Sequence, residues 1–165
     1  MMSDSRIEAL ERRLQDVEDR LAIYQLLATY GPAVDSLAHE TIEAMWAVDG
    51  TYQISDSFYG SARAVSDMLD EPRHQGYVNA GCGHVMSLPH LTIEGDTAVA
   101  TGYARIHLTE GDNIKIQRMS ATRWELVRTA AGWQVKRRTN IPLDGRKTAR
   151  ELLARALEPK AKPSA

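Results

Sequence analysis

Helix-forming and strand-forming segments are separated along this chain, and their order limits the folds that it can adopt. The first part carries the spacing of amphipathic helices, whereas the part after Gly81 consists of apolar runs divided by glycine-containing turns. Consecutive strands joined by short turns pair as an antiparallel meander, and preceding helices bury their apolar faces against it. The order therefore predicts an α+β domain in which a curved antiparallel sheet wraps around the N-terminal helices.

The helical part begins with one long helix. A serine near its start can cap it, and Gly31-Pro32 is expected to end or kink it just after Tyr30. Residues 71–80 are polar and rich in turn formers, so they are expected to form a mobile loop. Shorter elements are expected as helices at 39–46 (stopped by Asp49-Gly50), 61–69 and 147–157 and as a strand at 51–54.

The strand-rich part is expected to hold four strands. The expected spans are 83–93, 97–109, 114–128 and 133–141. In the second span, small residues from Ala98 to Ala104 alternate with larger ones such as Tyr103 and Arg105, so the small face should leave room for a helix or a ligand. Arg137 and Arg138 alternate across the last strand, so one should face inward and the other outward.

A seven-residue apolar repeat marks the start of the long helix. The repeat comprises Ile7, Leu10, Leu14, Val17, Leu21 and Tyr24. It predicts either packing against another subunit or an amphipathic helix that lies on its own domain. The expected organisation is an N-terminal helical extension at 1–20, a single domain at 21–157 and a disordered tail at 158–165.

Composition narrows the class of protein. The chain has 165 residues, of which 43% are hydrophobic and 25% charged, as in an ordinary globular domain. The net charge of −2 gives no basic footprint for nucleic acid, and no run approaches the about 18 apolar residues of a membrane span. Because there is one cysteine and no apolar leader in the first residues, a cytoplasmic location is expected.

Two residues stand where a structural core would normally have neither. Asp35 follows the broken end of the long helix in YGPAVDSL, and His84 lies in the apolar run CGHVMSL. A buried carboxylate is costly unless it is paired, and a histidine is a natural partner because the carboxylate fixes its tautomer and supports the imidazolium. If the fold brings the two together at a pocket, they form a general base.

Structural explanations of the same residues remain open. Asp35 could cap the following helix, and His84 could be an ordinary core histidine. Cys82, His84 and His90 share strand parity, but Pro89 breaks the alternation and no zinc-like spacing is present, so no metal site is predicted. No phosphate-binding glycine loop or dinucleotide fingerprint is present either, and no cofactor is expected.

The span from about Leu21 to Ile141 resembles the SnoaL-like branch of the nuclear transport factor 2-like superfamily, near scytalone dehydratase, bile-acid 7α-dehydratase and hexachlorocyclohexane dehydrochlorinase. The resemblance implies a conical α+β barrel with a central pocket. It also implies that Asp35, in AVDSL, and His84, in CGHVM, are the catalytic pair.

Further site residues follow from the same resemblance. Tyr30 matches a pocket position of this group, and Arg138, in WQVKRRTN, falls where the dehydrochlorinase has a pocket arginine. A pocket tyrosine shared by the two dehydratases falls on Ile54, with Tyr52 on the same strand face. Tyr52, Ile54 and Trp46 are the candidate substrate-binding residues, although tryptophans are more often part of a core.

The leading hypothesis is a cofactor-independent lyase, of the dehydratase type, that acts on a small apolar cyclic or polyketide-like substrate. In this hypothesis His84 removes a proton from carbon, Asp35 orients its ring, and Tyr30 and Arg138 stabilise the developing oxyanion or leaving group. The alternatives are a ketosteroid-type isomerase, a non-catalytic binding or assembly module, and a small structural subunit of an oxygenase. A homo-oligomer, trimer or dimer, is expected in each case.

Overall fold

Short glycine turns make the C-terminal strands pair in sequence order. In the computed structural model, which describes residues 4–158, β5 (Thr97–Glu110), β6 (Asn113–Thr129) and β7 (Gly132–Pro142) form an antiparallel meander. Gly111 and Gly132 lie in or next to the hairpin turns. Their φ values are 58° and 99°, which residues other than glycine rarely adopt. The meander predicted from the sequence is therefore confirmed.

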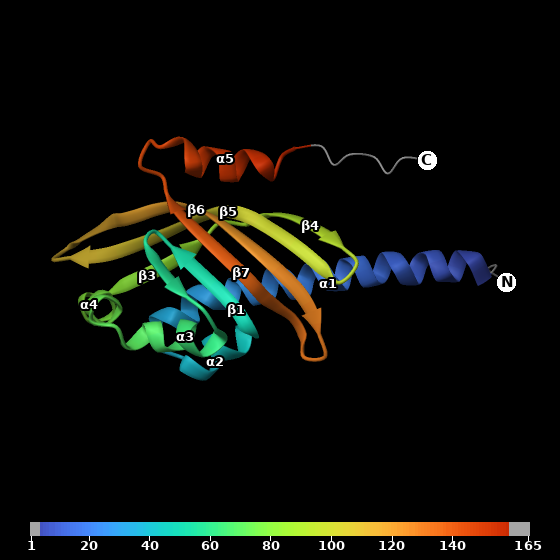
Figure 1. The fold of residues 1–165 in the computed structure, drawn as a ribbon, viewed down its shortest axis with the longest axis horizontal. Helices are drawn as coiled ribbons and strands as arrows, with labels where there is room; N and C mark the ends of the chain where they lie inside the picture. Colours follow the sequence, from blue (N-terminus) through green and yellow to red (C-terminus); the bar gives the residue numbers. More distant parts are fainter. Residues whose placement is uncertain (1–3, 159–165) are drawn as a thin grey trace.

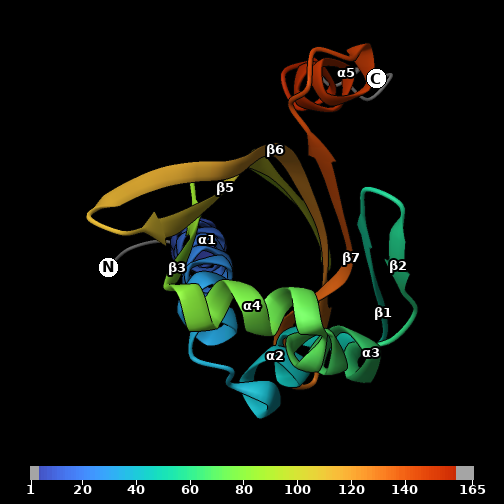
Figure 2. The same ribbon diagram turned by 90° about the vertical axis from the view of Figure 1, so that its left-hand side faces the viewer.

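The sheet is extended on both sides of the meander. β1 (Trp46–Ile54) runs parallel to β7, and β2 (Ser57–Tyr59) pairs with the free edge of β1. On the other side, β3 (Cys82–Met86) and β4 (His90–Glu94) pair with different halves of β5. The sheet curves strongly without closing, and Figures 1 and 2 show that it wraps around α1 (Asp4–Asp35).

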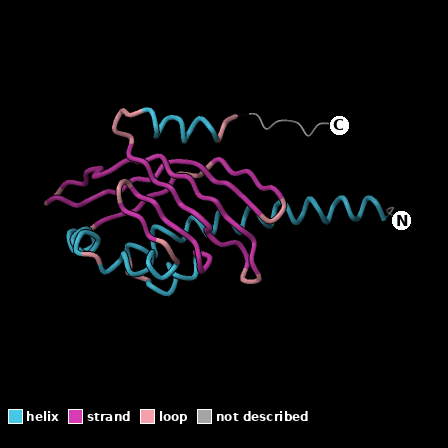
Figure 3. Tube along the Cα trace, in the orientation of Figure 1, coloured by secondary structure: helices cyan, strands magenta, loops and turns pink. Residues whose placement is uncertain are grey.

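The remaining helices lie at one end of the sheet and on its outer face. α2 (His39–Met45), α3 (Ala62–Asp67), the 3₁₀ turn η1 (Met68–Asp70) and α4 (Pro72–Ala80) gather near the C-terminal end of α1, with α4 across the open end of the sheet (Figure 2). α5 (Lys147–Arg155) packs on the outer face against Ala121 (Figure 3). No helix of residues 4–158 is both long and apolar enough to cross a membrane.

Three sequence-based boundaries are wrong. α1 does not stop after Tyr30 but runs five residues further, because a proline removes only its own N–H while its carbonyl still accepts from the amide of Ser36 at 3.0 Å. Residues 71–80 are not a loop, since Pro72 at the first turn starts α4. The strand expected at 83–93 is two strands, because the chain leaves the ladder at 87–89, where Ser87 Oγ accepts from the amide of Tyr103 at 2.9 Å.

The boundary expected between α2 and the following strand is also wrong. Asp49-Gly50 does not stop the helix; it lies inside β1, where the pairing with β7 shifts between Trp46 and Thr51. A Cβ on Gly50 would lie 2.6 Å from the carbonyl oxygen of Val135, so only glycine allows the strands to approach there. Of the tail expected at 158–165, residues 159–165 lie outside the described part of the chain.

The inward face of the meander is the small-residue face predicted from the sequence. Ala98, Ala100 and Ala104 are buried, whereas Tyr103 on the opposite face is 41% exposed. These small side chains leave room beneath the sheet for α1 and for the aromatic residues of the core.

A bulge in β7 decides which of the two neighbouring arginines faces inward. Val135 pairs with Leu126 and Arg137 with Glu125, so one additional residue of β7 lies between these pairs. Strict alternation from Val135 would turn Arg137 inward, but the extra residue shifts the pattern by one. Arg138 is accordingly buried, with 1% of its surface exposed, and Arg137 is exposed.

Gly31 allows α1 to lie against β3. A Cβ at this position would lie 2.2 Å from the carbonyl oxygen of His84, a distance that no side chain can occupy. Because the obstacle is backbone, it cannot move aside without displacing the strand. The glycine that the sequence presents as a helix breaker thus serves as a close-packing position between helix and strand.

We expect Gly31→Ala to destabilise the protein by about 1–3 kcal/mol, because the added methyl group forces α1 and β3 apart. Gly76→Ala is the matched control, since Gly76 also lies in a helix but a Cβ there meets nothing within 4 Å. The control should be neutral or stabilising by about 0.5–1 kcal/mol. Urea unfolding of both variants measures the difference, and equal stability of the two would contradict the close approach.

Candidate functional site

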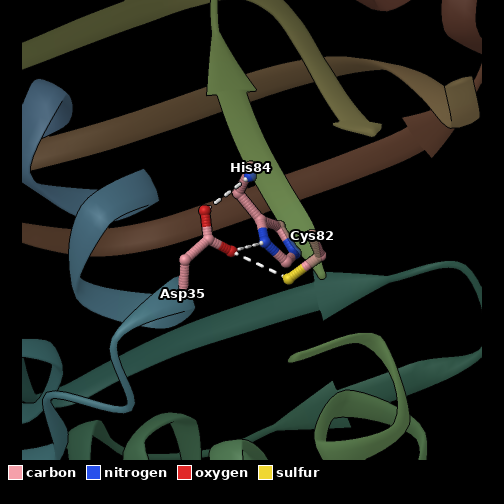
Figure 4. A group of neighbouring side chains, drawn as sticks. All are labelled: Asp35, Cys82 and His84. Atoms are coloured by element: carbon pink, nitrogen blue, oxygen red, sulfur yellow. Dashed lines mark hydrogen bonds and ion pairs between the residues drawn. The ribbon is translucent and has the colours of Figure 1, made fainter. Parts of the chain in front are cut away.

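The C-terminal end of α1 meets β3 through one carboxylate. Asp35 is the last residue of α1, and its Oδ1 lies 2.5 Å from Nδ1 of His84 (Figure 4). Its Oδ2 accepts the backbone amide of His84 at 2.8 Å, and Oδ1 also accepts the thiol of Cys82 at 3.2 Å. Three donors from one strand therefore hold the carboxylate.

These contacts keep Asp35 ionised. Burial acts to raise the pKa of its carboxyl group, but the hydrogen bonds from the ring and amide of His84 and from Cys82 outweigh burial and hold the pKa below its usual value. Burial and the adjacent carboxylate raise the pKa of the Cys82 thiol to about 12, so the thiol stays protonated as a donor. The pair is thus a carboxylate facing an imidazole.

Asp35 does not cap the next helix. The residue before α2 is Ala38, which offers no side-chain cap, and both Asp35 oxygens are used by β3. Since Nδ1 of His84 faces the carboxylate, it carries a proton there, and Nε2 is left as the basic nitrogen. The side chain of His84 is 9% exposed and lines a cavity.

The cavity is narrow and mixed in character. Its volume is about 60 Å³, and a smaller chamber of about 10 Å³ that shares several wall residues lies next to it. The wall combines aromatic and aliphatic side chains with polar and charged ones: Tyr30, Tyr52, Ile54, Ser57, Tyr59, Met68, Glu71, Arg73, His74, Tyr77, His84, Ile106 and Arg118. A cavity of this volume accommodates only a small group of a ligand.

A buried cation that pairs with no carboxylate of residues 4–158 lies at the inner end of the cavity. The Cζ atom of Arg138 is 4.0 Å from the ring centroids of both Tyr30 and Trp124 and 4.6 Å from that of Tyr52. Its Nε donates a long hydrogen bond of 3.4 Å to Thr122, and its Nη1 has no hydrogen-bond partner among the described residues. Three aromatic faces therefore offset the charge, and the two N–H bonds of Nη1 lack an acceptor within residues 4–158.

Tyr30 and Tyr52 contribute hydroxyl groups to the same wall. Tyr30 is 2% exposed, and burial raises the pKa of its phenol, so the hydroxyl is neutral and can donate a hydrogen bond. Its ring centroid lies 6.4 Å from that of His84. The hydroxyl of Tyr52 accepts from the side-chain amide of Asn140 at 3.4 Å.

Most of the predicted site residues lie at the cavity, but not all of them line it. Five of them line the cavity or its inner chamber: His84, Tyr30, Arg138, Tyr52 and Ile54. Asp35 does not line either space but contacts His84 from behind. Trp46 does not line either space. It lies behind them, 1% exposed, with its ring centroid 6.0 Å from that of Tyr30.

His74 is a cavity residue that sequence reasoning missed. It lies on α4, its Nε2 donates to the carbonyl of Val34 at 2.9 Å, and its ring centroid is 5.6 Å from that of His84. Burial lowers the pKa of His74, so the ring is neutral near pH 7. Reading Pro72 as a helix start would have placed His74 on a helix face rather than in a loop.

The donor atoms of Asp35, Cys82 and His84 lie within 4.8 Å of one another, a spacing that a metal ion could bridge. The chemistry of the set does not favour one. The thiol is held protonated, and both Cys82 and His84 direct their hydrogens at the carboxylate rather than at a common centre. His90, which shares strand parity with them in the sequence, is on β4 opposite Thr101 and takes no part.

Comparison with known proteins agrees with this architecture. A sequence profile of the SnoaL-like domain matches residues 15–139. The chain is similar to a nuclear transport factor 2-like protein with a cystatin-like fold from Novosphingobium aromaticivorans, at 35% identity and a TM-score of 0.87, over 93% of this chain and 99% of that one. No curated protein matches the chain significantly.

More distant structures share the fold alone. A protein of unknown function from Mycobacterium tuberculosis superposes with a TM-score of 0.69 at 14% identity, over 90% of each chain. A protein from Catenulispora acidiphila in complex with S-DNPA superposes with a TM-score of 0.64 at 21% identity, over 78% of this chain and 96% of that one. With the profile match over most of its length and the site geometry described above, this chain belongs to the SnoaL-like domain family of the nuclear transport factor 2-like superfamily.

Proposed function

We propose that this protein is a cofactor-independent lyase that uses Asp35 and His84 as a general base for a dehydratase-type elimination. The observation that carries the proposal is the 2.5 Å contact between Asp35 Oδ1 and His84 Nδ1. That contact leaves Nε2 of His84 as the base at a narrow cavity whose wall mixes apolar and polar side chains. A cyclic or polyketide-like molecule that carries a carbonyl and a β-hydroxyl group fits this chemistry.

The reaction divides into two proton movements. Nε2 of His84 removes a proton from the carbon next to the carbonyl, and the ionised Asp35 stabilises the imidazolium that forms. The electron pair moves onto the carbonyl oxygen, where the hydroxyl of Tyr30 and the free N–H of Arg138 can donate hydrogen bonds. When the enolate collapses, the C–O bond of the β-hydroxyl breaks, and the imidazolium returns its proton to release water.

The neighbouring side chains support the choice of His84 over His74. Nε2 of His74 is bound to the backbone carbonyl of Val34, and burial lowers the pKa of its ring. No carboxylate of residues 4–158 forms a hydrogen bond with this ring to stabilise a positive charge. His84 has that carboxylate. We assign His74 the role of a neutral wall that limits water around the base.

Ketosteroid-type isomerisation is the second candidate, and the same base supports it. In that case the imidazolium returns the proton to another carbon of the substrate and nothing leaves. Mass spectrometry of the products separates the two reactions, because elimination loses one water whereas isomerisation conserves mass.

We expect His84→Ala to lower kcat by about 10²–10⁴-fold, because the base is lost. Asp35→Asn should also lower kcat strongly, since it removes the charge that supports the imidazolium. The substrates are cyclic β-hydroxyketones in D₂O. Mass spectrometry measures two quantities, the uptake of deuterium at the α-carbon and the loss of water. His90→Ala is the matched control and should keep full activity, because His90 is exposed on β4.

Wild-type rates of uptake in His84→Ala would contradict the assignment of the base. No uptake by the wild-type protein across such a panel, combined with tight binding of the same ketones, would instead favour the non-catalytic binding module.

Tyr30→Phe tests the oxyanion donor. The variant keeps the ring that packs on Arg138 and removes only the hydroxyl, so kcat should fall by about 10²–10³-fold with little change in melting temperature. Tyr24→Phe, on the same helix but away from the cavity, should leave kcat unchanged. A loss of stability without a loss of kcat would assign the Tyr30 hydroxyl a structural role.

A further inference from the structure

The N-terminal half of α1 carries an apolar stripe that nothing in the described chain covers. The five side chains of the stripe are between 42% and 64% exposed: Ile7, Leu10, Leu14, Val17 and Leu21. The buried side chains of the same helix, including Asp19, Ile23 and Leu27, lie on nearly the opposite side, given about 100° of rotation per residue. The stripe therefore faces away from the domain, which excludes packing of the helix on its own domain through this face.

Asp19 anchors α1 to the sheet at the position where the helix begins to extend beyond it. The carboxylate of Asp19, 6% exposed, accepts from both terminal nitrogens of Arg128, at 2.7 and 2.5 Å, and from Nε1 of Trp133 at 3.1 Å. Upstream of this clamp the helix extends beyond the sheet (Figure 1). Because the downstream half is anchored in the core, the stripe is presented on a helix that is already formed, which lowers the entropic cost of association.

Charged residues flank the stripe in a self-complementary pattern. Arg6 and Arg13 lie along one side of it, and Glu11 and Glu18 lie along the other. Each arginine precedes its glutamate by five residues, which is the offset that brings the two side chains together between parallel paired helices. None of these four residues forms an ion pair within residues 4–158, in contrast to Arg20, which pairs with Asp16 at 3.0 Å.

We propose that a second copy of this chain docks on the stripe through a parallel helix pair. Arg6 and Arg13 of one protomer then face Glu11 and Glu18 of the partner subunit, and the reciprocal pairs form by symmetry. An antiparallel pair would place arginine against arginine and glutamate against glutamate, so the charges select the parallel arrangement. The two globular bodies then lie on the outer sides of the pair, because each packs on the face of α1 opposite the stripe.

The test is sedimentation velocity on the full chain and on charge-reversed variants. The wild type should be a concentration-dependent dimer. Arg6→Glu combined with Arg13→Glu places only acidic groups beside the stripe, so its dissociation constant should rise by about tenfold or more. Glu11→Arg combined with Glu18→Arg should weaken self-association similarly, whereas an equimolar mixture of the two double variants should form a heterodimer.

Arg12→Glu is the matched control, because Arg12 is an exposed charge of the same helix outside the flanking rows. It should assemble like the wild type. Circular dichroism checks that every variant keeps its helix. A monomeric wild type, or double variants that assemble as tightly as the wild type, would overturn the proposal; the latter result would place any subunit contact elsewhere, for example on the strand face that carries Tyr103.

Discussion

The close contact between the end of α1 and β3 is the constraint on which the site depends. Gly31 lets the helix backbone approach the carbonyl of His84. One turn later, Asp35 accepts hydrogen bonds from the ring and the amide of the same residue. Backbone packing thus sets the distance between α1 and β3. The carboxylate accepts hydrogen bonds from three partly buried donors that would otherwise lack an acceptor. A helix that ended at Gly31 could not deliver Asp35 to this strand.

The charges around the cavity are arranged differently at its two ends. Asp35 and His84 form a hydrogen-bonded pair at the edge strand, whereas Arg138 lies deeper and is balanced by the faces of Tyr30, Tyr52 and Trp124. A buried carboxylate beside Arg138 would neutralise it, but aromatic faces leave its N–H groups able to bind a developing negative charge. Base and anion-stabilising groups therefore stay separate within one small space.

Part of the site could be predicted from the sequence. The unusual positions of Asp35 and His84 suggest a pairing, the resemblance to the SnoaL-like branch implies Tyr30 and Arg138, and the meander and its small inward face follow from turns and alternation. Other features could not be predicted because they depend on one-residue shifts. The bulge that turns Arg138 inward has no signature in the run of alternating residues, and Pro72 signals both a turn and a helix start, so His74 was missed.

Local sequence patterns are enough to predict the α+β class, the meander of β5, β6 and β7 and the apolar stripe on α1, because these features rest on periodicity and turn chemistry. Which groups meet is visible only in the folded chain: it sets the distance from Asp35 to His84, the three rings around Arg138 and the face of α1 that stays uncovered. These contacts join residues far apart in the chain. Their geometry is set by the curvature of the sheet and by the approach at Gly31, which no local pattern encodes.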